Sequence, residues 1–306
     1  MIAILAALIP IFLLILAGYG LKRLRFLPEQ GWQSLDRLNY FVLFPVLLLT
    51  SVGKAEIGRV ELLPLLCGML GGVASVAVLT LACRKLIGGS GPTFTSAMQG
   101  AIRFNTYVTL AGAAGLWGPA GTATIALGIA FAVPLVNIFC IATLLKWGEG
   151  GGHFGPKTFV LQLVRNPLIV GCVAGLIVNL AGGFPTLIKP FFDILAAASL
   201  PLGLLSVGAS LDWESARRAG RPVLISSALK LLAFPCIAHG IARLMGADPL
   251  TLGIVTLFGS MPTATAAVVL ARQMGGDVKA MAAITTFQTL AAFVTVPLML
   301  GLLLSL

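Results

Sequence analysis

Long apolar segments alternate with short polar connections along the whole chain of 306 residues. A helix that crosses a bilayer needs about 20 apolar residues. Ten segments approach that length: 2–21, 35–53, 61–83, 94–115, 120–145, 160–181, 187–211, 222–245, 250–272 and 278–305. The sixth is the least regular, because Arg165, Asn166 and Pro167 interrupt its start. The pattern predicts an all-α integral membrane protein with ten transmembrane helices in a single membrane domain, residues 1–306.

The basic residues test this count, because connections on the cytoplasmic side carry an excess of lysine and arginine. Connections after the odd-numbered segments contain 14 of the 20 basic residues, and those after the even-numbered segments contain four. The other two, Arg103 and Lys230, lie inside segments. We therefore expect a multi-pass protein of the cell inner membrane with both termini on the outer, periplasmic side.

Two short stretches resemble each other across 157 positions. Phe104-Asn105-Thr106 is followed after eleven residues by Gly118, and Met261-Pro262-Thr263 is followed after eleven residues by Gly275. Both stretches lie inside apolar segments, where a broken helix frees backbone groups that lipid cannot satisfy. Such breaks are typical of the binding sites of secondary transporters.

Weaker matches follow the same order, such as Pro45 in the second segment and Pro201 in the seventh. We predict two repeats of five helices, about 1–146 and about 158–306, joined by a short cytoplasmic loop at 147–157. Five is an odd number, so the halves must have opposite orientation, which is the inverted-repeat plan of many transporters. Chance similarity among apolar helices is the alternative.

The fourth and ninth segments then form a symmetric pair. If they break near Asn105 and Pro262 and cross there, the N-termini of their second halves direct partial positive charge at the crossing. That arrangement favours an anionic ligand. No carboxylate is expected at the crossing. Asp36 and Glu61 stand at the very start of their segments, and Asp193 is the only acidic residue expected within a membrane span. The pattern therefore argues against cation antiport.

Composition excludes several other classes. The chain is 58% hydrophobic and 10% charged, whereas soluble domains are about 25% charged. The net charge of +10 comes from basic residues scattered through the connections, without the aromatic interleaving of a nucleic-acid-binding surface. The five cysteines show no paired spacing, and with two histidines they form no familiar zinc pattern. We expect no metal, cofactor or nucleic-acid partner and no enzymatic activity.

Four stretches carry a family resemblance: 103–107 (RFNTY), 200–208 (LPLGLLSVG), 261–265 (MPTAT) with 268–272 (VVLAR), and Pro297 in the last segment. They resemble the auxin efflux carrier family, which includes plant PIN auxin carriers and bacterial malonate or other organic-acid permeases. The resemblance implies a scaffold (helices 1, 2, 6 and 7) and a transport domain (helices 3–5 and 8–10) with crossed, broken helices 4 and 9. The same architecture is similar to sodium/proton antiporters and bile-acid/sodium symporters.

One departure from the family concerns helix 4, which commonly has a proline about two turns after the asparagine. This chain has Gly112 in that neighbourhood. We therefore expect a softer break there, resting on glycine flexibility, whereas Pro262 enforces the break in helix 9. Pro45 and Pro201 are expected to kink the scaffold helices, with plain packing as the alternative.

The candidate substrate-binding residues surround the two breaks: Arg103, Asn105, Thr106, Lys230, Ser260, Pro262, Thr263 and Thr265. Arg103 is suited to a substrate carboxylate, or else to carbonyls freed by the break. Asn105 offers two donors and an acceptor, for a ligand or for capping. The hydroxyls alternatively bond back to their own helices, and Lys230 alternatively snorkels.

Asp193 and His239 are weaker candidates for proton or ion coupling. The favoured function is a secondary transporter that carries a small organic anion, auxin-like or a mono- or dicarboxylate, by alternating access. The alternative is a sodium-coupled organic-anion symporter of the bile-acid type. The expected partners are the substrate and the lipid bilayer, with a second copy of the chain as a candidate. Substrate identity, direction and coupling are left open by the sequence.

Overall fold

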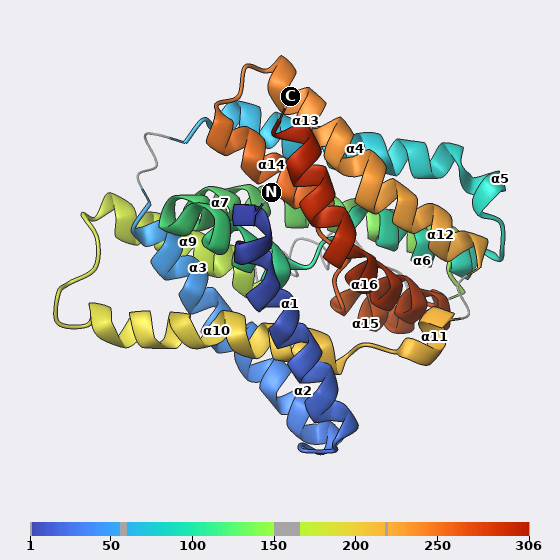
Figure 1. Cartoon of the computed structure of the whole chain (residues 1–306), viewed down its shortest axis with the longest axis horizontal. Helices are drawn as coiled ribbons and strands as arrows, with labels where there is room; N and C mark the ends of the chain where they lie inside the picture. Colours follow the sequence, from blue (N-terminus) through green and yellow to red (C-terminus); the bar gives the residue numbers. More distant parts are fainter. Residues whose placement is uncertain (1, 56–59, 150–165, 218–219, 306) are drawn as a thin grey trace.

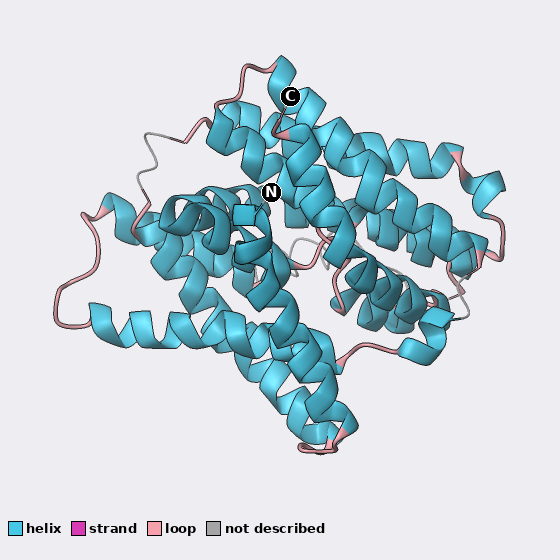
Figure 2. Ribbon diagram, in the orientation of Figure 1, coloured by secondary structure: helices cyan, strands magenta, loops and turns pink. Residues whose placement is uncertain are grey.

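The computed structural model describes residues 2–55, 60–149, 166–217 and 220–305, and these residues form helices and loops without any strand (Figure 2). The start of the sixth predicted segment (160–165) and most of the predicted loop 147–157 lie outside them. The helices, with two π-helical turns named η1 and η3, are α1 (Ile2–Arg23), α2 (Glu29–Leu38), η1 (Asn39–Leu43), α3 (Phe44–Gly53), α4 (Leu62–Ala82), α5 (Arg84–Ile87), α6 (Gly91–Ile102), α7 (Thr106–Trp147), α9 (Pro167–Leu180), α10 (Lys189–Ala209), α11 (Trp213–Arg217), α12 (Arg221–Ala228), η3 (Leu229–Ala233), α13 (Phe234–Leu244), α14 (Pro249–Ser260), α15 (Ala266–Gln273) and α16 (Val278–Leu303).

Seven helical segments among the described residues are long and apolar enough to cross a membrane. One of them, Gly91–Trp147, covers two of the predicted spans, and the apolar helices α9 and α14 are shorter than a full span. The all-α prediction is confirmed for the described part of the chain. The count of ten transmembrane helices stays a prediction.

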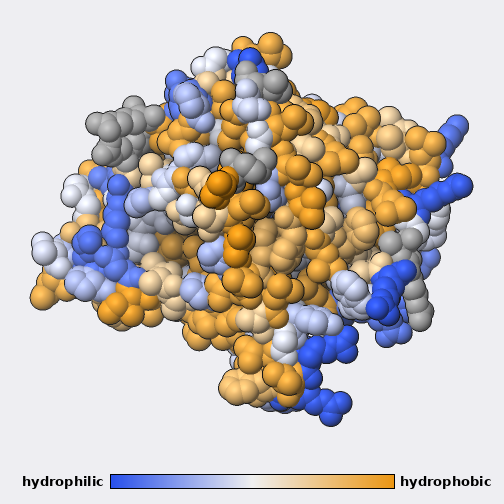
Figure 3. All heavy atoms as spheres, viewed as in Figure 1, coloured by the Kyte–Doolittle hydropathy of each residue, from blue (hydrophilic) through white to orange (hydrophobic). Residues whose placement is uncertain are grey.

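The outer surface is apolar in the way a lipid-facing surface must be. Large apolar side chains such as Val78, Ile177 and Val294 are each more than 60% exposed, although they lie within apolar helices. Figure 3 shows orange, hydrophobic side chains over most of the visible face, with blue, polar ones gathered at the edges. A soluble domain seldom exposes so large a contiguous apolar surface.

The helices pack in two groups. In the first, α3 lies against α9 and α10, and α1 lies against α10. In the second, α4 packs on α13 and α14, while α6 packs on α7, α12 and α16. The first group fills the lower left of Figure 1 and most of the second fills the upper right. Contacts of α7 with α1, α3 and α10 join them.

Gly118 divides α7 into two helical parts. Its backbone adopts φ 58° and ψ −145°, which is non-helical, and only glycine adopts such angles without strain. The residue after it, Pro119, is suited to starting the second part, since proline is favoured in the first turn of a helix. The fourth and fifth predicted segments are therefore separated by this glycine.

Candidate functional site

Two helices of the second group are interrupted, and the interruptions touch each other. The chain leaves helical geometry between α6 and α7, over Arg103–Asn105, and again between α14 and α15, over Met261–Thr265. The backbone N–H of Asn105 donates a hydrogen bond of 2.7 Å to the carbonyl oxygen of Pro262. The two stretches that the sequence singled out therefore meet directly.

The two broken helices have matching first halves. Both α6 and α14 contain 12 residues, and a side chain caps each start: Ser90 for α6 and Asp248 for α14. Both end where the backbone turns extended, at Arg103 (φ −72°, ψ 157°) and at Met261 (φ −72°, ψ 142°). At each break, a helix C-terminus and a helix N-terminus therefore lie close together.

Asn105 caps the second half of the first broken helix. Its Oδ1 accepts hydrogen bonds from the backbone N–H groups of Tyr107 (3.1 Å) and Val108 (3.2 Å). The side-chain oxygen of Asn105 is therefore occupied by the N–H groups of its own helix. Asn105 thus fills the capping role, which was the alternative to ligand binding. By contrast, Thr265 precedes α15 without a side-chain cap, and the N–H groups of Ala267 and Val268 donate to the carbonyls of Ala264 and Thr265. Both second halves therefore satisfy part of their first-turn N–H groups, α7 through a side chain and α15 through the backbone.

Gln288 of α16 connects both breaks and was not predicted from the sequence. Its Oε1 accepts a hydrogen bond of 3.0 Å from the Thr263 N–H, and its Nε2 donates one of 3.0 Å to the carbonyl of Gly100, near the end of α6. The Thr263 hydroxyl lies 3.5 Å from the Gln99 carbonyl. The sequence could have indicated this role, because a glutamine in the middle of an apolar segment must find hydrogen-bond partners for its amide inside the protein.

Two basic side chains lie beside the crossing. Arg103 is partly exposed, and its Nη1 is buried without a hydrogen-bond partner among the described residues. Lys230, in η3, is fully buried, and its Nζ also has no partner there. The Lys230 amine lies 4.0 Å from the centre of the Phe234 ring and 5.7 Å from that of Phe258. Cations bind the faces of aromatic rings.

Phe258 links Lys230 to the first break. Its ring centre lies 4.5 Å from that of Phe104 and 5.6 Å from that of Phe234. Phe104 is itself part of the interrupted stretch between α6 and α7. Burial of the whole Lys230 side chain excludes snorkelling, the alternative considered from the sequence.

The remaining residues predicted for the substrate site form two sets: two are bonded within the protein, and two are partly exposed. Ser260 bonds back to its own helix, its hydroxyl donating to the Thr256 carbonyl at 2.8 Å. Pro262 is buried at the crossing, with its carbonyl bound by Asn105. Thr106 and Thr265 are partly exposed at the starts of α7 and α15. Both threonines therefore stand where a ligand at the helix N-termini would lie.

Gly112 does not break its helix, and the prediction that it does is wrong. It lies inside α7, where the only non-helical residue is Gly118. Because Asn105 starts α7 with a cap, the break falls before the helix. A side chain on Gly112 would meet Leu257 at 3.3 Å, so the glycine provides close packing against α14.

The two scaffold prolines occupy different settings. Pro45 lies in the first turn of α3, directly after the π-helical turn η1. A π-helical turn before a proline relieves the clash of the ring with the preceding turn. Pro201 lies inside α10, which continues as one helix from Lys189 to Ala209.

The weaker coupling candidates lie away from the crossing. Asp193 forms ion pairs with Lys54 and, at 3.0 Å, with Lys189, all on the exposed surface near the start of α10. His239 is buried, with Nδ1 2.9 Å from the Thr256 hydroxyl and Nε2 without a partner among the described residues. Neither residue contacts the breaks through a described hydrogen bond.

A second acidic residue does lie in an apolar segment, so the expectation that Asp193 is the only one is wrong. Asp36 belongs to the segment Glu29–Gly53, and its carboxylate accepts a hydrogen bond from the Ser206 hydroxyl. Three residues further on, Asn39 accepts one of 3.1 Å from Ser199. The sequence could have indicated this polar contact, because the spacing of the residues places each pair on one face of its helix.

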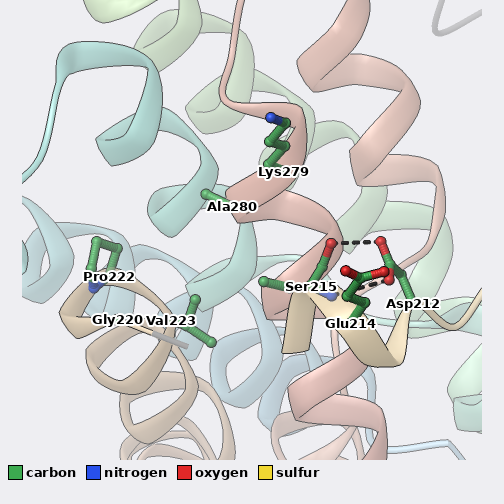
Figure 4. Close-up of a pocket in the computed structure, with 9 residues that line it drawn as sticks. Asp212, Glu214, Ser215, Gly220, Pro222, Val223, Lys279 and Ala280 are labelled. Carbon is green, nitrogen blue, oxygen red and sulfur yellow. Dashed lines mark hydrogen bonds between the residues drawn. The ribbon is translucent and has the colours of Figure 1, made fainter. Parts of the chain in front are cut away.

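A cavity of about 450 Å³ lies elsewhere, among α11, α12 and α16 (Figure 4). Asp212, Glu214 and Lys279 contribute its charged groups. Hydrogen bonds from the Ser215 hydroxyl (2.5 Å) and backbone N–H (3.0 Å) lower the pKa of Asp212 below its usual value. Two carboxylates against one lysine do not favour an anion, so this cavity is a poor candidate for the site.

Comparison with known proteins gives the class of the protein. Residues 156–300 match the family model described as "Membrane transport protein". A relative from Methanothermobacter thermautotrophicus, named "Uncharacterized transporter", is 27% identical over 293 residues, which cover 94% of both chains. Another, from Methanocaldococcus jannaschii and also named an uncharacterized transporter, is 22% identical over 299 residues, 92% of this chain and 94% of the relative.

A third relative has a more specific name. A protein of Rhizobium meliloti, named "Putative malonate transporter", is 26% identical over 281 residues, 87% of this chain and 85% of its own. Together with the apolar helices, these similarities indicate a multi-pass membrane transporter rather than an enzyme. The family match covers 145 of the 306 residues, all in the second half of the chain, and it agrees with the resemblance to the auxin efflux carriers.

Proposed function

We propose that the chain carries a small organic anion across the cell membrane by alternating access, with the anion bound where the two helix breaks meet. The observation that carries the proposal is the contact of Asn105 with Pro262 beside Arg103, whose Nη1 is buried without a partner among the described residues. A guanidinium binds a carboxylate through two parallel, charge-assisted hydrogen bonds. The N-termini of α7 and α15 follow the two breaks, and the partial positive charge of a helix N-terminus favours an anion.

The proposed architecture has ten transmembrane helices in two inverted repeats, about 1–146 and about 158–306. Support comes from the equal lengths of α6 and α14 and from their matching extended ends. The scaffold would be the group of α1–α3, α9 and α10, and the transport domain would be α4–α7 and α12–α16. Transport then consists of one group moving against the other around the anion.

The substrate class follows from the charges at the crossing. Arg103 and the helix N-termini favour an anion, and the name of the Rhizobium meliloti relative points to malonate as the first compound to test. Export of an anion from a negative-inside cell is favoured by about 2.3 kcal/mol per charge per 100 mV. Export therefore needs no coupling ion, whereas uptake does.

A thermal-shift screen of the purified protein with malonate and other mono- and dicarboxylates tests the binding. We expect a carboxylate to raise the unfolding temperature in a concentration-dependent way, because a ligand that binds only the folded state stabilises it. The same shift should disappear in Arg103→Gln. Stabilisation by malonate only in the presence of sodium favours the bile-acid-type symporter instead, and no stabilisation by any carboxylate counts against an organic anion.

A further inference from the structure

A polar strip connects the first helix group to the crossing, and its residues have no part in the helix breaks. On one side, Asp36 and Asn39 lie three residues apart at the end of α2 and the start of η1. On the other side, Ser199 and Ser206 of α10 donate hydrogen bonds to Asn39 and Asp36 respectively. Both serines are at most 5% exposed.

The strip lies against the second helix group at Gly203. A side chain on this glycine would begin 2.6 Å from the Tyr107 ring and 2.8 Å from the Asn39 amide nitrogen. Tyr107 follows the first break by two residues, at the start of α7. The strip therefore reaches the boundary between the two groups, at the level of the proposed anion site.

The Asn39 side chain joins the strip to the start of α7. Asn39 is 1% exposed, its Oδ1 accepts the hydrogen bond from Ser199, and its amide interacts with the Tyr107 side chain. The strip is therefore continuous from Asp36 to the residue that follows the first break by two positions.

Asp36 lies at the surface of the first helix group and not in its sealed interior. The groups around it leave the charge of its carboxylate largely uncompensated. From α7, Tyr107 approaches it; Tyr40 of η1 interacts with Tyr107, and Arg103 acts electrostatically on Tyr40. From α10 only the neutral Ser206 faces it, and on its own helix Glu29 is paired with Lys22 while Arg37 is exposed.

We propose that Asp36 is the proton-binding site that couples proton movement to anion transport, which rests on the proposed function. An organic anion at the crossing repels the Asp36 carboxylate across the strip, so the two bind favourably together only when Asp36 takes up a proton. The proton comes from water and adds to Oδ2, while Oδ1 keeps the hydrogen bond from Ser206. When the anion leaves, the proton returns to water on that side.

Binding of the two ligands is then reciprocal, because the coupling free energy between two sites is the same in both directions. Low pH strengthens anion binding, and the anion strengthens proton binding. With the membrane potential clamped, one proton per anion allows accumulation of up to about tenfold for each unit of pH gradient. This gives uptake the coupling ion that it needs.

Proteoliposomes with radiolabelled malonate test the coupling in two assays. The first is counterflow, the exchange of labelled for unlabelled malonate without any gradient. The second is accumulation driven by a pH gradient, acidic outside, with the voltage clamped by potassium and valinomycin. We expect the unmodified protein to perform both. Asp36→Asn should keep counterflow and lose at least nine-tenths of the gradient-driven accumulation.

Asp212→Asn is the matched control, because it neutralises a carboxylate of the loop before α11, and it should keep both activities. Gradient-driven accumulation by Asp36→Asn at the unmodified level overturns the inference while leaving the proposed function intact. Loss of counterflow in folded Asp36→Asn also overturns it, since the residue then serves binding and not coupling. Absence of counterflow in the unmodified protein refutes the proposed function, and the inference with it.

Discussion

Replacement of Gln288 by leucine should destabilise the protein more than its modest change in volume suggests. The change removes both bonds of 3.0 Å that the amide makes, one with the Thr263 N–H and one with the Gly100 carbonyl. Leaving a buried polar group unpaired costs about 1–3 kcal/mol. Hydrogen bonds between membrane helices measure about 0.6 kcal/mol on average and about 1.7 kcal/mol at most. Two groups therefore give about 2–6 kcal/mol by the first estimate and about 1.2–3.4 kcal/mol by the second. We expect the free energy of unfolding to fall by the amount on which both agree, about 2–3 kcal/mol.

Thr289→Val is the matched control on the same helix. Thr289 is also fully buried, but its hydroxyl donates only to the Thr285 carbonyl of its own helix, at 2.8 Å. Its loss leaves no backbone group of the crossing unpaired, so we expect a cost below about 1 kcal/mol. Thermal or denaturant unfolding in detergent measures both variants. Equal stability of the two would refute the bridging role of Gln288.

Three further predictions concern other parts of the molecule. Gly203→Ala should cost about 1–3 kcal/mol and slow malonate flux, because its side chain meets Tyr107 and Asn39, whereas Gly240→Ala, with open space around it, should do neither. Single cysteines replacing Gln30 and Ser215 should react with membrane-impermeant maleimide only from the cytoplasmic side, and one replacing Phe184 only from outside; the reverse pattern refutes the topology. Ser215→Ala removes a hydrogen bond that lowers the pKa of Asp212. Because a lowered carboxyl pKa contributes stability that is lost as pH falls, acid unfolding of this variant should begin at a higher pH, and an unchanged midpoint contradicts the assignment.

The sequence predicted the parts of the fold that depend on local pattern. Apolar length marked the helices, and the paired stretches around Asn105 and Pro262 marked the two breaks, which lie in contact. Gly112 was misjudged because glycine permits both a break and close helix packing, and only its neighbour Leu257 decides between them. The cap by Asn105 had already fixed where the helix begins.

The residues that were missed depend on contacts across the fold. Gln288 lies 25 residues from Thr263 and 188 from Gly100 in the sequence, so only the packed structure brings its amide to both breaks. Asp36 stands at the edge of an apolar segment, where a carboxylate usually faces water. Its partner Ser206 is 170 residues away, and no local pattern connects the two.

The central claim, an anion site at the crossing, is tested most directly by malonate counterflow in proteoliposomes containing Arg103→Gln. Arg84→Gln is the matched control, because it removes the same charge from a residue stacked on Trp147 at 4.6 Å, away from the breaks. Loss of a charge-assisted bond of about 1.5–3 kcal/mol should weaken the apparent affinity for malonate about 10- to 100-fold in Arg103→Gln. Equal affinity and flux in both variants would contradict the account.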